Sequence, residues 1–388
     1  MNVLIRITTV PISLKILLKG QLNYMVRHGF ILIGVSSKGA ELDEVKKEEE
    51  IETCELEMTR TISFRKDIKA LWGFYKLCKK EKPKIVHSHT PKAGIVGMLG
   101  AKLAGVPIRL HTVAGMPLME ATGLRRKLLD FVERLTYWSA TKVYPNSKGL
   151  ENFILENGYT ISNKLRVIAN GSSNGINTSQ FSKEVISAEQ QNLLKNDLGI
   201  RNDDFVFVFV GRLVGDKGAN ELVEAFCQLN YPSVKLLLVG PLESDLDPLD
   251  KDTLRRIDDN ERIISVGFQK DVRPYFAISN VLVFPSYREG FPNVVMQAGA
   301  MELPAIVSDI NGCNEIIIEG KNGIIIPVKN VEAVKDAMEM MLTNKELYLK
   351  MKRNARRMIT ERYEQQVVWD ALLTEYKSLL KDKGLDNV

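Results

Sequence analysis

The chain has 388 residues, of which 45% are hydrophobic and 26% charged, which is the composition of a globular protein with enough length for two domains. No apolar run approaches the roughly 20 residues that a membrane-spanning helix needs, and Arg6, Lys15 and Lys19 interrupt the N-terminal segment, so we expect neither a span nor a signal peptide. The net charge of +5 divides into +10 for residues 1–190 and −5 for the remainder, and the four scattered cysteines, which lack metal-ligand spacing, favour a reducing cytoplasm.

The N-terminal half alternates short β-branched runs with helical patterns. Apolar residues recur at helical spacing from Leu14 to Met25, and amphipathic patterns also cover residues 63–80 and 123–137. Strands that alternate with helices of this length are typical of βαβ units and a parallel sheet. The predicted strands are Val3–Thr8, Phe30–Val35, Ile51–Leu56, Lys84–His89, Ile108–Val113, Lys142–Pro145 and Arg166–Ile168.

The same alternation restarts at Phe205–Val210, which is apolar on both faces, as a central parallel strand must be. We place the domain boundary in the polar stretch 182–204, which gives domains of residues 1–185 and 186–364, and we expect the C-terminal helix (365–388) to pack back on the first domain. The predicted fold class is α/β, with two doubly wound, Rossmann-like domains in tandem and a ligand cleft between their strand ends. The further strands are Lys235–Val239, Ile263–Val266, Val281–Phe284, Ala305–Ser308 and Ile324–Val328.

A glycine-rich turn follows the first strand of the second half and leads into a helix. It reads GRLVGDKG from Gly211 to Gly218 and carries two cations, Arg212 and Lys217. Glycines let the backbone approach a ligand closely, a helix N-terminus attracts an anion, and arginine can bind phosphate bidentately. The pattern predicts a diphosphate site that is not a Walker loop; an ordinary strand-to-helix turn with two surface cations is the alternative.

A second motif, PSYREGFPNVVMQAGA, follows strand Val281–Phe284. Pro292 suits the first turn of a helix, so the free amides just before that turn would face a ligand. Glu289 on the loop and Gln297 on the same side of the helix can hold hydroxyl groups at two ends of one polar ligand, unless Glu289 only caps the helix or is solvated. The free amides are those of Phe291, Asn293 and Val294.

Three of the four histidines lie at the ends of two strands in the first half. His87 and His89 end one strand, just before Lys92, and His111 lies near the end of the next, before Gly115. Because the ends of parallel strands meet at one edge, we expect a role in the cleft, although a lone histidine is more often a core residue. No Asp, Glu or Cys joins them at ligand spacing, so no metal site is expected.

In order and spacing, these segments resemble the retaining glycosyltransferases of family 4, which have the GT-B fold. The resemblance extends over nearly the whole chain and also includes HSHTPK, the Asn170-Gly171 pair and GCNEIIIEGKNG from Gly312 to Gly323. Within the family, the chain resembles bacterial enzymes of capsular polysaccharide and lipopolysaccharide synthesis. The resemblance implies transfer of a hexose or N-acetylhexosamine from a nucleotide-sugar, with UDP favoured over GDP, to a polyprenyl-diphosphate-linked saccharide on the inner leaflet.

The resemblance also implies a role for each matching residue. Arg212 and Lys217 would neutralise the departing diphosphate, Glu289 would contact hydroxyls of the transferred sugar, and Gln297 would hold the ribose. The other donor-binding residues would be Gly211, Gly240, Phe268, Asp271, Gly290, Phe291, Asn293 and Val294, with the base near Phe268 and Asp271. The acceptor-side residues would be Ser13, His89, Lys92, His111 and Gly115.

The chain departs from the family pattern at three places. Gln297 replaces a glutamate, Ala114 replaces the active-site histidine, and residues 9–13 replace paired glycines after the first strand. The resemblance implies front-face attack, in which the departing phosphate accepts the acceptor's proton, so no strong protein base is needed. No DxD motif stands in a suitable place, so we expect no metal ion and no other cofactor.

The basic first half suggests an anionic partner, which phosphate groups, a membrane surface or nucleic acid would provide. Basic residues cluster between Arg60 and Lys84 and again at 125–127, after the apolar stretch Met116–Met119, which we expect to be exposed and to enter the lipid headgroup region beside these cations. Aromatics on a basic strand, which are typical of nucleic-acid binding, are absent. We expect a cytoplasmic protein attached peripherally to the inner membrane face; a mere difference between two solvated surfaces is the alternative.

Three other functions fit parts of the sequence. A non-hydrolysing nucleotide-sugar epimerase has the same architecture but needs acid and base groups around the sugar, and the N-terminal motifs hold few carboxylates. A dinucleotide-dependent oxidoreductase needs a GxGxxG turn, and none follows a predicted strand. A non-catalytic sugar-nucleotide-binding protein is favoured by Gln297 and Ala114, and a turnover assay would distinguish it.

Overall fold

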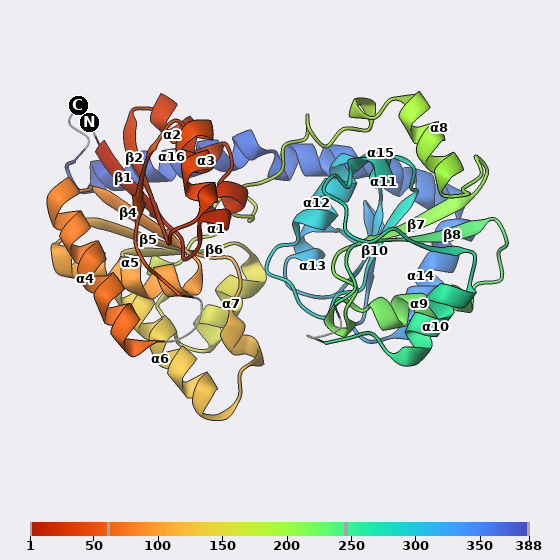
Figure 1. Ribbon diagram of the computed structural model, residues 1–388, viewed down its shortest axis with the longest axis horizontal. Helices are drawn as coiled ribbons and strands as arrows, with labels where there is room; N and C mark the ends of the chain where they lie inside the picture. Colours follow the sequence, from red (N-terminus) through yellow and green to blue (C-terminus); the bar gives the residue numbers. More distant parts are fainter. Residues whose placement is uncertain (1, 60–62, 244–246, 386–388) are drawn as a thin grey trace. The chain divides into compact units, whose positions relative to one another are not determined.

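The computed structural model describes residues 2–59, 63–243 and 247–385, which divide into two compact units. Unit 1 comprises Met1–Gly175 and Gln365–Val388, and unit 2 comprises Ile176–Glu364 (Figure 1). The first division precedes the polar stretch 182–204 in which we expected it. The C-terminal segment belongs to unit 1.

Backbone contacts explain why the division falls early. The amide of Ile176 donates to the carbonyl of Tyr363 at 2.8 Å. The guanidinium of Arg356 donates to the carbonyls of Thr178 and Phe181, at 3.0 and 2.9 Å. The segment that follows residue 175 is therefore bound to the end of unit 2, and polarity alone could not reveal these pairings.

Unit 1 contains one parallel sheet of six strands in the order β3-β2-β1-β4-β5-β6 (Figure 1). The sequence predicts these six strands with ends that differ by at most one residue. The seventh predicted strand, Arg166–Ile168, is wrong, because this segment forms only an isolated bridge through Leu165 to Val143. The strands are β1 (Asn2–Ile7), β2 (Phe30–Ser36), β3 (Glu52–Glu55), β4 (Ile85–His89), β5 (Ile108–Val113) and β6 (Lys142–Pro145).

Helices cover both faces of this sheet, because β1 has apolar side chains on both of its faces. Ile5 and Ile7 lie in a core with α4, α5, α6 and α7, whereas Leu4 lies in the opposite core with α1, α2, α3 and α16. The helices are α1 (Pro11–Leu17), α2 (Gln21–Arg27), α3 (Ala40–Glu48), α4 (Phe64–Glu81), α5 (Pro91–Ala104), α6 (Gly123–Ser139), α7 (Lys148–Glu156) and α16 (Gln365–Asp382).

The helical pattern from Leu14 to Met25 is two helices rather than one. Gly20 adopts a left-handed conformation with φ of 78°, which ends the first helix and begins the second. A Cβ atom at Gly20 would lie 2.6 Å from the ring of Trp369 on α16, so the break also admits the C-terminal helix. The apolar spacing continues across the break, which is why periodicity alone did not reveal it.

Unit 2 repeats the architecture around a second parallel sheet, in the order β12-β11-β10-β7-β8-β9. The predicted α/β fold of two doubly wound domains is confirmed. The strands are β7 (Phe205–Val210), β8 (Val234–Val239), β9 (Ile263–Ser265), β10 (Val281–Phe284), β11 (Ala305–Ser308) and β12 (Gly323–Ile326). The helices are α8 (Ala188–Asp197), α9 (Ala219–Cys227), α10 (Lys251–Asp259), α11 (Arg273–Ala277), α12 (Asn293–Ala300), α13 (Cys313–Ile316), α14 (Val331–Thr343) and α15 (Lys345–Tyr363).

Each sheet has one topological switch point, where successive connections run in opposite directions. In unit 1 it lies between β1 and β4, and in unit 2 it lies between β7 and β10. Ligands of open α/β sheets bind outside the carboxyl ends of the strands at such points. None of the helices within the described ranges has both the length and the apolar character to cross a membrane.

Candidate active site

The two donor-side motifs meet at the switch point of unit 2. The loop after β7 carries Arg212 and Lys217, and the loop after β10 carries Glu289. These strands are hydrogen-bonded neighbours, so residues distant in sequence leave the sheet side by side. The switch point therefore brings together the residues that the sequence predicts for a nucleotide-sugar.

Two glycines, one in the turn after β7 and one directly after β8, are required because other backbone lies against them. A Cβ atom at Gly240 would lie 1.8 Å from the carbonyl oxygen of Gly211, and one at Gly218 would lie 2.2 Å from that of Pro285. Gly218 also has a φ of 69°, in the left-handed region, and it precedes the first residue of α9. The strand ends pack so closely that no side chain fits between them, which leaves polar backbone at the carboxyl edge.

Lys217 and Glu289 form the central contact of the site. The ammonium of Lys217 pairs with Oε1 of Glu289, and the two side chains are only 18% and 17% exposed. The hydroxyl of Ser286 donates to the same carboxylate oxygen at 3.1 Å. An ammonium has three donors, so Lys217 can hold Glu289 and still bind an anion.

The other cations of these loops pair with carboxylates that sequence reasoning missed. Nη1 of Arg212 lies 2.8 Å from Oε2 of Glu243, in a pair whose side chains are 45% and 32% exposed. Arg288 pairs with Asp216 at 2.7 Å. Exposed ion pairs contribute about 0–1 kcal/mol, so the Arg212 guanidinium can exchange Glu243 for a phosphate at small cost.

The loop after β10 leads directly into the N-terminus of α12. Pro292 is the N-cap residue, one position before the first turn in which the sequence places it, and Gln297 lies about one turn into the helix. The first amides of any helix lack intrahelical acceptors, so those of Asn293 and Val294 can donate to a ligand. The positive end of the helix dipole at this N-terminus also favours an anionic ligand.

A residue that the sequence analysis overlooked holds this loop in shape. The side-chain amide of Asn311 donates to the carbonyls of Glu289 and Gly290, at 3.2 and 2.5 Å. A Cβ atom at Gly312 would lie 2.6 Å from the same Gly290 carbonyl. The ring of Phe291 packs edge-on against Tyr363 with centroids 5.4 Å apart. Asn311 comes close to this loop only in the folded structure, so its role could not be predicted from the residues around it in the sequence.

The residues predicted near the nucleotide base lie on the loop after β9. Phe268 is 74% exposed, which is unusual for a large aromatic side chain and leaves its face free to stack on a planar ring. Asp271 is held by two hydrogen bonds from the guanidinium of Arg273, at 2.8 and 2.6 Å. This pairing lowers the pKa of Asp271, so the carboxylate is ionised and already has a partner.

The acceptor-side residues gather at the switch point of unit 1. The amide of Thr9 donates to the hydroxyl of Thr90 at 3.1 Å, which joins the loops after β1 and β4. Lys92 forms an ion pair with Asp67 at 2.5 Å and is 11% exposed. Ser13 lies in the first turn of α1, and Gly115 lies exposed on the loop after β5.

The predicted histidines are buried beneath this edge rather than exposed on it. His89 and His111 are each 3% exposed. Nε2 of His89 accepts from the fully buried guanidinium of Arg6 at 2.9 Å, and Nδ1 of His111 lies 2.9 Å from the Ser88 hydroxyl. Burial holds the pKa of His89 well below its usual range and lowers the pKa of His111 to about 4, so both rings are neutral and act as hydrogen-bonding groups.

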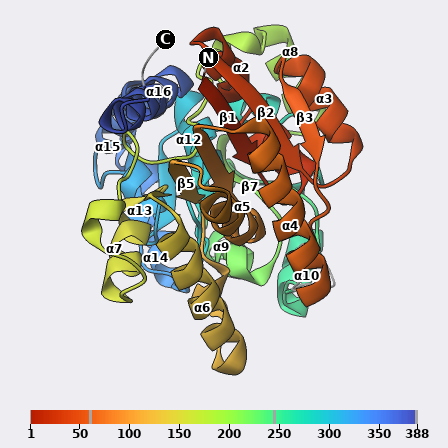
Figure 2. The ribbon, with the colours of Figure 1, turned by 90° about the vertical axis from the view of Figure 1, so that its left-hand side faces the viewer.

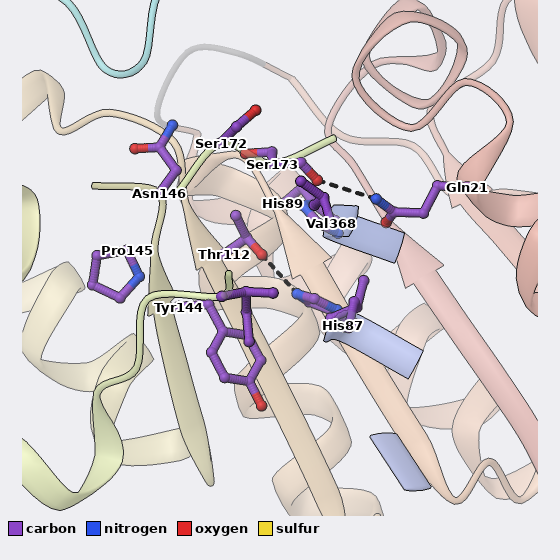
Figure 3. A pocket seen from close by; sticks show the side chains of 12 residues that line it. Gln21, His87, His89, Thr112, Tyr144, Pro145, Asn146, Ser172, Ser173 and Val368 are labelled. Carbon is purple, nitrogen blue, oxygen red and sulfur yellow. Dashed lines mark hydrogen bonds between the residues drawn. The ribbon is translucent and has the colours of Figure 1, made fainter. Parts of the chain in front are cut away.

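A small cavity of about 20 Å³ lies in this buried polar layer (Figure 3). His87 lines it, and its Nε2 lies 2.7 Å from the Thr112 hydroxyl, while the Gln21 amide donates to the Ser173 carbonyl at 3.1 Å (Figure 3). Such a volume holds about one water molecule, so no sugar ring enters here.

The buried state of His111 predicts a pH dependence of stability. An unfolded histidine has a pKa of about 6.5, so protonation favours unfolding as pH falls from about 6.5 towards 4. The free energy of unfolding of the wild type, relative to a His111→Asn variant, is expected to fall by about 3 kcal/mol between pH 7 and pH 4. Denaturant titrations at both pH values measure it.

Two features make this comparison specific. Burial raises the pKa of Glu133 to about 7, which acts on stability with the opposite sign, but this term is common to both proteins and cancels. His28 is exposed, so His28→Asn should show no such difference from the wild type. A wild-type advantage over His111→Asn that is the same at both pH values would contradict a neutral, buried His111.

Two family models match the chain, one in each half. The model described as "Glycosyl transferases group 1" matches residues 190–358, which include the Lys217–Glu289 site. The model described as "Glycosyl transferase 4-like domain" matches residues 32–171 of unit 1. The first match covers all six strands of unit 2, and the second covers β3 to β6 and most of β2 in unit 1, whereas β1 lies outside it.

Individual relatives extend over nearly the whole length. A capsular polysaccharide biosynthesis glycosyltransferase of Staphylococcus aureus, CapM, is 31% identical over 369 residues, which are 94% of each chain. A UDP-Gal:α-D-GlcNAc-diphosphoundecaprenol α-1,3-galactosyltransferase of Escherichia coli is 31% identical, and the match covers 78% of this chain and 77% of that one.

A solved structure shares the fold. Anabaena HepE in complex with UDP superposes with a TM-score of 0.79 at 17% identity, and the match covers 97% of this chain and 100% of that chain. Both halves match glycosyltransferase models, and a relative is 31% identical along 94% of each chain. The chain therefore belongs to the group 1 glycosyltransferases, with a family 4-like N-terminal domain and the GT-B fold.

Proposed function

We propose that this glycosyltransferase moves a hexose or N-acetylhexosamine from a UDP-sugar to a polyprenyl-diphosphate-linked saccharide, with retention of configuration, in surface-polysaccharide synthesis. The carrying observation is the Lys217–Glu289 pair, set between a glycine turn and the N-terminus of α12 at the switch point of unit 2. The relatives support the substrates, since the Escherichia coli enzyme is named for a UDP-sugar donor and a diphosphoundecaprenol-linked acceptor.

The donor binds unit 2 through its diphosphate. Lys217 and Arg212 bind the phosphate oxygens, and the amides of Asn293 and Val294 supply further donors. Departure of UDP places negative charge on the β-phosphate, and cations fixed in advance stabilise that charge most in the transition state. Glu289, held by Ser286 and Lys217, accepts hydrogen bonds from hydroxyls of the sugar.

The nucleoside is held further from the chemistry. Gln297 hydrogen-bonds the ribose hydroxyls, and Phe268 offers an exposed ring beside the base. Retention follows when the acceptor hydroxyl attacks from the face that the phosphate leaves. The hydroxyl proton passes to the departing phosphate oxygen, a glycosidic bond forms, and the bond from the anomeric carbon to that oxygen breaks. This route needs no protein base, which accommodates Ala114.

The acceptor binds at the exposed carboxyl edge of unit 1, around Gly115 and above the largely buried Lys92. Its diphosphate-linked lipid requires the enzyme to work at a membrane surface, so we infer peripheral attachment on the cytoplasmic face. The basic net charge of residues 1–190 supports this inference, because an anionic leaflet attracts it.

A donor and acceptor screen tests the proposal. Purified protein is incubated with UDP- and GDP-sugars and a polyprenyl-diphosphate saccharide, and the lipid product is measured by mass spectrometry. The expected result is one added sugar with release of UDP. Conversion of UDP-sugar without acceptor would favour an epimerase instead, and binding without any turnover would favour a non-catalytic protein.

Transfer is expected to be unchanged in excess EDTA. Two cations and the N-terminus of α12 provide positive charge at the diphosphate, so no divalent ion is needed there. The measurement is the initial rate with the chelator in molar excess over total divalent ions. Loss of activity that Mg²⁺ or Mn²⁺ restores would contradict this expectation.

A further inference from the structure

Helix α4 carries a row of large apolar side chains that nothing in the described structure covers. Phe64 is 81% exposed, and Ile68 and Trp72, one and two turns later, are each 57% exposed. The opposite face of the same helix is buried in the core through Phe74 and Cys78. A helix that only covers a sheet would carry polar groups on its outer face, so this second apolar face needs another explanation.

Helix α6 repeats the feature. Leu124 is 84% exposed, Leu128 is 44% exposed and Phe131 is 62% exposed, at spacings that place them on one side of the helix. Its other side is buried through Thr136 and Tyr137. Two helices of the same unit thus have an apolar outer stripe.

The two stripes lie on neighbouring parts of unit 1. Helix α5 packs against both α4 and α6, so the three helices lie side by side on one face of the sheet (Figure 2). Helix α4 follows β3 and α6 follows β5, so both begin at the carboxyl edge of a parallel sheet. Phe64 and Leu124, in the first turns, therefore lie at the same edge as Gly115.

Basic side chains flank both stripes. Trp72 has the ammonium of Lys76 5.7 Å from its ring centroid. Mixed aromatic and basic faces are typical of helices that lie in a membrane interface. The exposed cations are Arg65, Lys66, Lys69, Lys76, Lys79 and Lys80 on α4, and Arg125, Lys127 and Arg134 on α6.

The apolar stretch Met116–Met119, which was also expected to be exposed, is largely buried. Met116 and Leu118 are buried, at 5% and 1% exposure, and only Met119 is exposed, at 48%. The expectation that this stretch faces outward is therefore wrong for its two buried residues, because they complete the core beside α6. Arg60 of the basic cluster lies outside the described residues.

We propose that α4 and α6 dock unit 1 onto an anionic lipid bilayer, with Phe64, Trp72, Leu124 and Phe131 entering the headgroup region and the flanking cations binding lipid phosphates. The site deepens the proposed function, because it brings a lipid-linked acceptor to the carboxyl edge of unit 1. Charge favours a bilayer over a second copy of the chain, since two equally basic faces repel each other.

Vesicle cosedimentation tests the docking surface. Full-length protein is mixed with phosphatidylcholine vesicles, with or without phosphatidylglycerol, at low and high salt. Wild type should partition at least tenfold more strongly onto the anionic vesicles, and salt should weaken this because screening shortens the Debye length. A Phe64→Ser, Trp72→Ser, Phe131→Ser variant should lose at least tenfold in partitioning.

A matched variant controls for the loss of three exposed apolar residues. Leu193, Leu254 and Met340 are also exposed but belong to unit 2, and their triple change to serine should leave partitioning unchanged. Circular dichroism and thermal melting show whether each variant is folded. The fluorescence of Trp72, in a Trp138→Phe, Trp369→Phe background, should shift to the blue on anionic vesicles and be quenched by brominated lipid.

Three results would overturn the proposal. The first is equal partitioning of wild type onto both vesicle types. The second is unchanged partitioning of a folded Phe64→Ser, Trp72→Ser, Phe131→Ser variant. The third is a wild-type dimer in sedimentation velocity that this triple variant abolishes. Transfer to a short-chain, water-soluble diphosphate acceptor separates the proposal from the proposed function. Transfer without vesicle binding would refute only the docking surface, and vesicle binding without transfer to either acceptor would refute only the function.

Discussion

Replacing Lys217 by alanine is expected to lower kcat by roughly 30- to 1,000-fold, which corresponds to about 2–4 kcal/mol of lost transition-state stabilisation. The ammonium is held at the switch point, largely out of water, where its attraction for the departing phosphate is weakly screened. Arg212→Ala should lower kcat within the same range. Steady-state rates of UDP release in the presence of acceptor measure both effects.

Two controls connect this loss to the phosphate rather than to folding. Lys321 is an exposed lysine just before the amino end of β12, at the edge of the parallel sheet opposite to the site, so Lys321→Ala should keep the wild-type rate. Thermal melting should show that each active-site variant remains folded. Near-normal rates in both Arg212→Ala and Lys217→Ala would remove the basis for the diphosphate assignment.

Glu289→Gln is expected to reduce kcat by more than about 100-fold, whereas Gln297→Glu should change it only slightly. In the proposed donor complex, Glu289 contacts the reacting sugar and its charge is balanced by Lys217, so a neutral amide would lose both the ion pair and the stronger acceptor. In the same proposal Gln297, one turn into α12, contacts the ribose, which takes no part in the bond change. A carboxylate there accepts ribose hydroxyls more strongly than an amide and should lower KM for the donor.

The relative size of the kcat losses in the two variants is the informative result. kcat and KM for the donor are measured for each protein at saturating acceptor. If Gln297→Glu were the more damaging change, the sugar and ribose ends of the donor would be reversed. If neither changed kcat, Glu289 would have only the structural role of partner to Lys217.

Much of the donor side could be predicted because its signals are local. The alternation in FVFVFV marks a buried parallel strand, and the glycines and cations that follow it lie within one turn. Pairings across the loops could not be predicted in this way. Asn311 and Glu243 reach the site only because parallel strands bring their loops together. Asn311 directly precedes the motif from Gly312 to Gly323 and Glu243 follows Gly240, but neither pattern indicates these two side chains.

The first unit was harder to interpret for a related reason. His89 and His111 were selected because they end strands, but whether a strand end faces solvent depends on what packs over it. Here the hydroxyl of Tyr376 on the C-terminal helix accepts from the guanidinium of Arg6 at 3.0 Å, lies 2.5 Å from Nδ1 of His87, and closes that layer. Met116 is buried in the core on the other face of the sheet, whereas Phe64 is exposed, and residue type alone does not distinguish these two apolar side chains.

The central claim is that unit 2 recognises the diphosphate of a UDP-sugar through Lys217 and Arg212. Isothermal titration of the wild type with UDP, UMP and uridine tests it directly, together with the same titrations of Lys217→Ala and Lys321→Ala. The account predicts that UDP binds at least tenfold more tightly than UMP, and that Lys217→Ala removes most of this difference while Lys321→Ala preserves it. Equal affinity of the wild type for UDP and UMP, or an unchanged preference in Lys217→Ala, would contradict it.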